Sequence, residues 1–128
     1  MRQIVDLRKQ KPELKVLLSI GGWGSGRFSE MAANDEYRRA FVADCARVVK
    51  EFALDGIDID WEYPTSSMAN ISSSPDDTEN FTLLMQDIRA AIGNEKELTL
   101  ATVASARYID FKAILPSVDF VNIMAYDM

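Results

Sequence analysis

The sequence contains no histidine and a single cysteine, Cys45, and these two scarcities exclude several kinds of chemistry. Without histidine the chain has no Ser-His or Cys-His nucleophile pair, no imidazole base and no histidine-ligated metal. One cysteine forms neither an internal disulfide nor a thiolate zinc cluster, and its place on an apolar helix face predicts a buried, inert thiol. The side chains left for chemistry are carboxylates, tyrosines and lysines.

Long apolar runs and a basic surface are also missing. No segment reaches the roughly 18 consecutive apolar residues of a membrane span. Residues 1–20 lack the apolar block and small-residue cleavage site of a secretory signal. With 14 basic and 20 acidic residues the formal net charge is −6, so we expect neither nucleic acid nor a membrane as partner.

Changes in the hydrophobic period predict alternating strands and helices. Strands are expected at residues 14–20, 56–61, 98–104 and 120–125, and all but the second are short apolar runs that we expect to be buried. Helical periodicity is seen in residues 2–10, 34–52, 75–92 and 110–115. In the second of these helices, the stripe expected to face the core is Tyr37, Phe41, Cys45, Val48 and Phe52. This order predicts an α/β fold with parallel strands joined by crossover helices.

The strand expected near residue 56 carries an unusual density of acidic residues. Positions 55–62 read Asp-Gly-Ile-Asp-Ile-Asp-Trp-Glu, in which acidic and apolar side chains alternate. Because neighbouring side chains on a strand point to opposite faces, Asp58, Asp60 and Glu62 share one face. The two isoleucines and the tryptophan between them share the other face, which we expect to pack under helices.

Three partly desolvated carboxyls in line favour a site for acid catalysis. Burial and like charge both raise the pKa of a carboxyl, so at least one proton is shared or retained near neutral pH. A carboxyl that keeps its proton beside charged neighbours is what general acid catalysis requires. Glu62 lies at the C-terminal end of the strand, where active sites occur in parallel α/β folds. From the spacing alone, a solvated acidic edge strand or a Mg²⁺ or Ca²⁺ site stays open.

Three motifs in order carry a resemblance to a known family. The run Asp55-x-x-Asp58-x-Asp60-x-Glu62, followed by Tyr63-Pro64, resembles the D-x-x-D-x-D-x-E signature of the glycoside hydrolase family 18 chitinases. Residues 19–23, Ser-Ile-Gly-Gly-Trp, resemble the S-x-G-G strand of that family, and residues 124–127, Met-Ala-Tyr-Asp, resemble its M-x-Y-D strand. The resemblance covers nearly the whole chain.

The resemblance implies hydrolysis of β-1,4 bonds between N-acetylglucosamine units, with retention of configuration and with the acetamido group of the substrate as nucleophile. It assigns Glu62 as the acid and Asp60 as the group that holds the acetamido N–H. Asp58 shares a proton with Asp60, and Tyr126 donates its hydroxyl to the acetamido oxygen. No metal or cofactor is implied, and chitin or an N-acetylglucosamine oligosaccharide is the expected ligand.

Further residues take roles from the same resemblance. It implies that substrate is bound by Asp127, Tyr63, Trp23 and Met124. Trp23 could equally fill the wall of the β-barrel that this family forms. It also suggests a cis peptide bond between Glu62 and Tyr63. The residues expected to have structural roles are Asp55, Gly56, Ser19, Gly21 and Gly22.

The fold implied by the resemblance is a (β/α)₈ barrel, which takes about 250 residues. Residues 1–128 are then part of one catalytic domain with four of eight strands, aligned with the third to sixth. We expect such a part to be inactive alone and to self-associate through its exposed sheet edges. The resemblance also implies that the complete protein is secreted or periplasmic.

Two other kinds of protein related to this family are alternatives to a chitinase. A chitin-binding lectin of the same fold lacks the catalytic acid, and the presence of Glu62 argues against it. An endo-β-N-acetylglucosaminidase that acts on glycoprotein glycans uses related chemistry. The Trp61-Glu62-Tyr63-Pro64 ending and Tyr126 favour the chitinase.

Overall fold

A parallel four-stranded sheet organises the chain, as the alternating pattern predicts. The computed structural model describes residues 1–126. Hydrogen bonds join the strands in chain order. The strands are β1 (Leu17–Gly21), β2 (Gly56–Asp60), β3 (Glu97–Val103) and β4 (Phe120–Met124). Every neighbouring pair is parallel, with Ser19 beside Asp58 and Asp58 beside Thr99.

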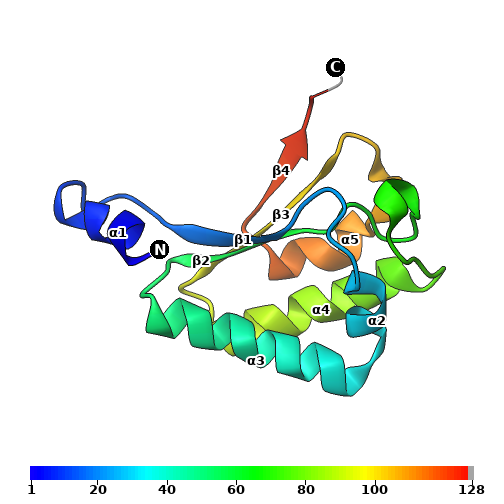
Figure 1. Ribbon diagram of the computed structural model, residues 1–128, viewed down its shortest axis with the longest axis horizontal. Coiled ribbons are helices and arrows are strands. Elements are labelled where there is room, and N and C mark those ends of the chain that lie inside the picture. Colours follow the sequence, from blue (N-terminus) through cyan, green and yellow to red (C-terminus); the bar gives the residue numbers. More distant parts are fainter. Residues whose placement is uncertain (127–128) are drawn as a thin grey trace.

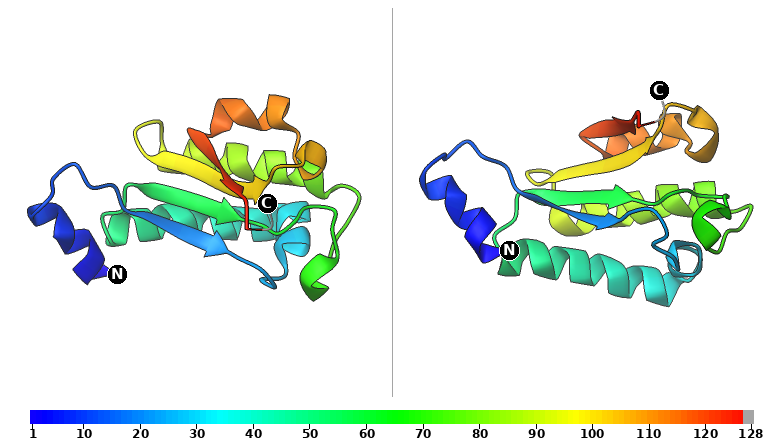
Figure 2. Two further views of the ribbon diagram at one scale, coloured as in Figure 1. Left: turned by 90° about the horizontal axis from the view of Figure 1, so that it is seen from above. Right: turned by 45° about the horizontal axis from the view of Figure 1, so that its top comes forward.

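Helices lie in each connection between strands and gather on one face of the sheet, whereas the short N-terminal helix lies beyond the end where β1 and β2 begin (Figure 1). The α-helices are α1 (Arg2–Val5), α2 (Phe28–Ala33), α3 (Asp35–Glu51), α4 (Asp77–Ile92) and α5 (Phe111–Ile114). Short 3₁₀ turns are η1 (Asp6–Lys9), η2 (Met68–Asn70), η3 (Ala106–Tyr108) and η4 (Leu115–Ser117). Helices α3 and α4 lie side by side under the strands, whereas the opposite sheet face is left open within residues 1–126 (Figure 2).

The core forms between this helical layer and the apolar side of the sheet. Ile57, Ile59 and Trp61 are almost completely buried, which confirms the alternation predicted for the acidic strand. The Trp61 ring stacks on Phe28 with 5.4 Å between ring centroids and meets the edge of Phe81 at 5.5 Å. Burying each large apolar side chain contributes about 1.5–3 kcal/mol, so this layer holds the acidic strand firmly in place.

Two helix ends follow local sequence rules. Asn34 caps α3, because its side-chain oxygen accepts a hydrogen bond from the Tyr37 amide at 3.0 Å. Gly93 ends α4 with a φ of 86°, a conformation that favours glycine. The expected stripe on α3 was partly wrong: Tyr37 is 59% exposed, and the buried residues are Val42, Cys45 and Val49. Val42, Cys45 and Val49 have the i, i+3, i+7 spacing of one helix face, and Tyr37 lies off that face.

Strands β1 and β4 form the two edges of the sheet, and the expectation that both are buried was wrong. Phe120 is 49% exposed and Ile123 is 52% exposed, while β1 is half-buried along most of its length. Each edge strand has a hydrogen-bonded neighbour on only one side within residues 1–126. Unpaired strand edges favour association, so self-association of this chain stays a prediction.

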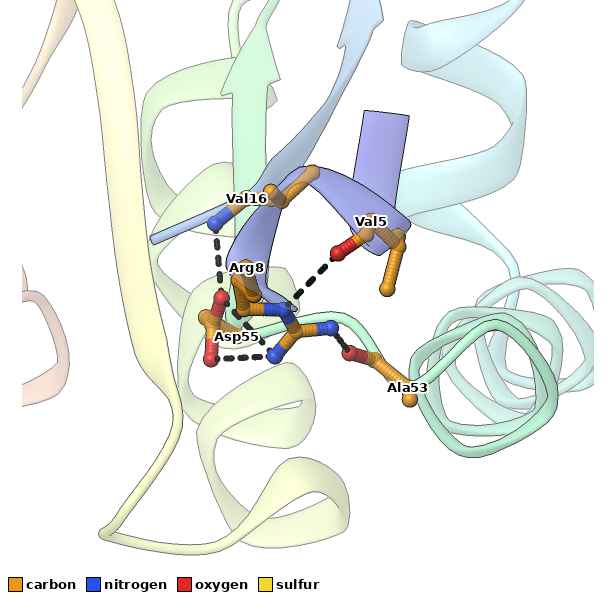
Figure 3. A network of polar contacts seen from close by, with 5 residues as sticks. All are labelled: Val5, Arg8, Val16, Ala53 and Asp55. Carbon is orange, nitrogen blue, oxygen red and sulfur yellow. Dashed lines mark hydrogen bonds and ion pairs between the residues drawn. The ribbon is translucent and has the colours of Figure 1, made fainter. Parts of the chain in front are cut away.

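At the N-terminal end of the strands, a polar network joins the first helical turns to the sheet (Figure 3). The Arg8 guanidinium forms an ion pair with Asp55 at 3.2 Å and donates to the carbonyl oxygens of Val5 and Ala53. The Val16 amide donates to the Asp55 carboxylate at 2.7 Å. Asp55 therefore joins β1, β2 and the N-terminal turns.

No helix of residues 1–126 is long and apolar enough to cross a membrane.

Gly56, the first residue of β2, sits where β2 and β3 approach closely. A Cβ atom added there would lie 1.9 Å from the carbonyl oxygen of Glu97. Any larger residue would force the two strands apart. This close contact fixes the register of the acidic strand against β3.

Candidate active site

The polar side of β2 presents its carboxyls on the open face of the sheet. Asp58 lies in the middle of the strand and accepts two hydrogen bonds from neighbouring strands. Ser19 of β1 donates its hydroxyl at 2.8 Å, and Thr99 of β3 donates at 2.6 Å. These two hydroxyls use both carboxylate oxygens of Asp58 and fix its orientation.

Asp60 lies at the end of β2, between Asp58 and Glu62. Its Oδ1 atom is buried and has no hydrogen-bond partner within residues 1–126. Burial, a hydrogen bond with Glu62 and the nearby charges of Glu62 and Asp58 together raise the pKa of Asp60 to about 7, and burial contributes most. Asp60 therefore carries a proton for much of the time near neutral pH.

Glu62 follows β2 and forms part of the wall of a cavity of about 580 Å³ at the C-terminal end of the strands. Its side chain is only 8% exposed, although it borders this open space. The lining residues are Trp23, Glu62, Tyr63, Val103, Ala104, Ser105, Met124 and Tyr126. The cavity therefore combines one buried carboxyl with three aromatic rings. Such a surface suits a sugar, because sugars present apolar ring faces and hydroxyl groups.

Aromatic side chains stand in contact along one side of the cavity. The Tyr63 ring stacks nearly parallel on Tyr108, with 4.8 Å between the ring centroids. Trp23 meets Tyr63 edge to face at 6.4 Å and is 61% exposed. The peptide bond between Glu62 and Tyr63 is cis, which confirms the expectation from the sequence. Trp23 thus leaves much of its side chain exposed at the cavity that Glu62 also lines.

Tyr126 and Met124 approach the same cavity from β4. Tyr126 lines the cavity and is 91% exposed, so it does not pack into the core. Asp127, the remaining residue of that motif, lies outside the described residues. Glu62 and Tyr126 line this cavity together, whereas Asp58 and Asp60 are not among its lining residues. These two lie along the strand before Glu62, and their side chains are held among neighbouring strands and carboxyls.

Within residues 1–126, no group of three acidic or cysteine side chains has the arrangement needed to hold a metal ion. The acidic side chains of β2 are spread along the strand, and Asp58 is committed to two hydroxyl donors. The geometry instead resembles a proton-handling site, with a protonated carboxyl beside a buried acid at a cavity wall.

Comparison with known proteins agrees with this geometry. Residues 1–128 match the model of the glycosyl hydrolases family 18. The chain belongs to this family. It is 37% identical to Chitinase A1 of Niallia circulans over 139 aligned positions, which span 99% of this chain and 20% of that protein. Chitotriosidase-1 of Mus musculus is 34% identical over 98% of this chain and 29% of its own length.

Solved structures support the same family 18 assignment. The chitinase domain of the spore coat protein CotE from Clostridium difficile matches 98% of this chain with a TM-score of 0.95 and 43% identity. A family 18 N-acetylglucosaminidase from Paenibacillus barengoltzii matches with a TM-score of 0.93 and 40% identity. This chain spans 38% and 40% of these two structures and less than a third of the two curated relatives. The four strands and their helices are a partial (β/α)₈ barrel.

In this family 18 chain, two glycines bring the end of β1 against the acidic strand. Gly21 has a φ of 123°, and a Cβ atom there would lie 2.0 Å from the carbonyl oxygen of Asp60. The amide of Gly22 donates to the same oxygen at 2.8 Å. Both glycines thus hold the backbone of Asp60, and Trp23 follows directly at the cavity.

The structure adds residues that sequence reasoning missed. Ala104 and Ser105 line the cavity directly after β3, and Tyr108 supports the Tyr63 ring. Thr99 orients Asp58 from β3. A signal for the first two was present, because the carboxyl ends of parallel strands meet at one edge of the sheet. Tyr108 carried no such signal, since only the folded loop brings it onto Tyr63.

Proposed function

We propose that residues 1–128 form part of a family 18 catalytic domain that hydrolyses β-1,4-linked N-acetylglucosamine polymers. The observation that supports this most directly is Glu62, a buried carboxyl at the wall of an aromatic-lined cavity. Beside it, the pKa of Asp60 is raised to about 7, chiefly by burial. The chitinase names of several relatives agree with this substrate class.

In the proposed reaction, Glu62 donates its proton to the glycosidic oxygen as the bond from that oxygen to the anomeric carbon breaks. The carbonyl oxygen of the substrate's acetamido group attacks the same carbon and forms a cyclic oxazolinium ion. The Glu62 carboxylate then takes a proton from water, whose hydroxide adds to the anomeric carbon and opens the ring. Two displacements at one carbon retain its configuration.

Asp60 and Asp58 act on the acetamido group in this proposal. The carboxylate of Asp60 accepts a hydrogen bond from the acetamido N–H and stabilises the positive charge that develops beside it. Asp58 is held by Ser19 and Thr99 and shares a proton with Asp60. A raised pKa at Asp60 makes this sharing possible near neutral pH.

The remaining cavity residues bind the sugar. Tyr126 donates its hydroxyl to the acetamido oxygen, and Trp23 offers its exposed ring to a sugar face. Tyr63 and Met124 complete the wall. Asp127 is proposed as a further sugar ligand from its place in the M-x-Y-D motif.

A chimaera tests this proposal. Residues 1–128 replace the matching segment of the CotE chitinase domain, so that the cavity is completed by the other strands. We expect the chimaera to hydrolyse chitooligosaccharides and Glu62→Gln to lower turnover by about three orders of magnitude or more, because the acid is lost. Glu95→Gln changes an exposed glutamate between α4 and β3 and serves as the matched control.

Near-normal turnover in Glu62→Gln would contradict the assigned acid. Binding of chitooligosaccharides without any hydrolysis by the unmodified chimaera would instead favour the lectin function. Release of glycans from a glycoprotein, with no action on chitooligosaccharides, would favour the endo-β-N-acetylglucosaminidase.

A further inference from the structure

A second carboxylate, Asp77, is completely buried outside the cavity. It is the first residue of α4, and its exposed fraction is 0%. Three donors from separate segments converge on it. Ser29 donates its hydroxyl to one oxygen at 2.7 Å, and the amides of Thr65 and Ser74 donate to the other, each at 2.9 Å. Together with the N-terminal end of α4, these donors satisfy a charge that would otherwise be costly to bury.

The Thr65 contact lies in the tight turn that follows the acidic strand. The amide of Ser66 donates to the carbonyl oxygen of Tyr63 at 3.1 Å and closes this turn. Pro64 occupies its second position and Thr65 its third, with a φ of 67°. A β-branched residue disfavours this left-handed conformation. The hydrogen bond from the Thr65 amide to Asp77 therefore helps to hold a turn that starts one residue after Glu62.

The Ser29 contact reaches the other loop of the cavity. Ser29 lies on α2, and residues 22–27 between β1 and α2 carry Trp23. Trp23 and Tyr63 meet edge to face across the two loops. One buried carboxylate thus joins both segments that carry the aromatic wall.

The next residue of α4 fixes a third loop. The Thr78 hydroxyl donates to the carbonyl oxygen of Tyr108 at 2.8 Å. The Tyr108 ring stacks on Tyr63 with nearly parallel planes. The first turn of α4 therefore contacts the segments that follow β1, β2 and β3, all at the end of the sheet where the cavity lies.

We propose that Asp77 is a positioning residue that sets the placement of Glu62, Tyr63 and Trp23 without contacting the ligand. It lies outside the cavity lining and acts through Thr65 and Ser29. Its effect on catalysis rests on the proposed function, whereas its effect on the two loops does not. The two parts are therefore tested separately.

The first test measures amide hydrogen exchange in residues 1–128. In Asp77→Asn one of the two acceptor oxygens becomes a nitrogen that only donates, and the remaining oxygen is a weaker acceptor because it no longer carries carboxylate charge. We expect the Thr65 and Ser74 amides to exchange at least about tenfold faster, with the core strands unchanged. Asp87→Asn is the matched control, because Asp87 lies ten residues further along the same helix and pairs with Arg38 instead of with the loops. Unchanged exchange at Thr65 and Ser74 would overturn the proposal.

The second test measures kcat and KM of the chimaera per folded molecule, well below its melting temperature. We expect Asp77→Asn to lower kcat by about tenfold or more, since small displacements of a catalytic group are costly, and Asp87→Asn to stay within about twofold. A folded Asp77→Asn variant with normal kcat would overturn the catalytic part. If Asp77→Asn does not fold, Ser29→Ala is measured in the same two experiments. We expect a smaller loss of kcat in that variant, and unchanged amide exchange together with unchanged kcat would contradict the proposal. If the unmodified chimaera is inactive, the proposed function fails, and amide exchange still decides the role of Asp77.

Discussion

Carboxylates at the two ends of the sheet have different charged partners. At the N-terminal end, Asp55 and Asp119 each precede a strand, accept an amide from a neighbouring segment and pair with an arginine. At the C-terminal end, no ion pair of residues 1–126 involves Asp58, Asp60 or Glu62. Carboxylates are thus paired with arginines at the N-terminal end of the strands, whereas at the C-terminal end their charged neighbours are other carboxyls.

The different partners shift the pKa values of Asp119 and Asp60 in opposite directions, so one carboxyl stabilises the fold and the other retains a proton. Burial alone would raise the pKa of Asp119, but the Leu98 amide and the Arg89 guanidinium outweigh it and lower that pKa. Asp60 has only burial and neighbouring carboxyls, so its pKa rises to about 7. The first arrangement favours the folded state near neutral pH, whereas the second reduces stability and keeps a proton available.

Breaking the arginine contacts at the stabilising end should have the largest effect. Arg89 pairs with Asp119 at 2.6 Å and also donates to the carbonyl oxygens of Ser117, Gly93 and Lys96. We expect Arg89→Met to lower the free energy of unfolding by about 2–3 kcal/mol, as these acceptors lose their donor. Urea denaturation measures this loss.

Arg47→Met is the control for that experiment. Arg47 pairs with Glu51 on an exposed helix surface, and we expect a change below about 0.5 kcal/mol. An equal loss in both variants would mean that the Arg89 contacts add no more than a surface ion pair.

The network around Arg8 should matter less. Arg8 pairs with Asp55 and donates to two carbonyl oxygens, but the helical turns that carry it, α1 and η1, contain no buried residue. We expect Arg8→Met to reduce the free energy of unfolding by about 1 kcal/mol, because Asp55 keeps the hydrogen bond from the Val16 amide. A loss as large as that of Arg89→Met would show that the N-terminal turns hold the sheet together more than their packing indicates.

At the opposite end, removing a carboxyl should change the pH dependence of stability. The folded pKa of Asp60 is about 7, above an unfolded value of about 3.9, so its destabilising effect is absent below about pH 4 and complete above about pH 7. The free energy of unfolding of Asp60→Asn, relative to that of the unmodified chain, should therefore increase by about 1 kcal/mol or more as the pH is raised from 4 to 8.

The matched variant for this comparison is Asp119→Asn. The lowered pKa of Asp119 makes its stabilising effect present above about pH 4 and lost in stronger acid, so its substitution should destabilise most near neutral pH. Parallel pH profiles for the two variants would contradict the difference between the two ends.

Much of this arrangement could be predicted from the sequence. The alternation of Asp58 and Asp60 with Ile57 and Ile59 predicted which side of β2 is apolar, because strand geometry has a fixed period of two. The capping residue Asn34 and the terminating Gly93 also marked real helix ends. These features depend on local rules that apply whatever the rest of the chain does.

Features that depend on distant segments could not be predicted. The exposure of Phe120 follows from its edge position, which the apolar pattern does not reveal. Asp77 looks like an ordinary acidic residue in the first turn of a helix, and only the fold brings Ser29 and Thr65 to it. The unequal treatment of Asp55 and Asp60 also depends on which cations lie nearby in space.

The most direct test of this account is the ionisation of Asp60 in residues 1–128. The carboxyl carbon of Asp60, assigned by comparison with Asp60→Asn, can be followed by ¹³C NMR while the pH is raised. We expect its titration to centre near the pKa of about 7. A midpoint near the ordinary aspartate value of about 3.9 would contradict the claim that this end of the sheet retains a proton for chemistry.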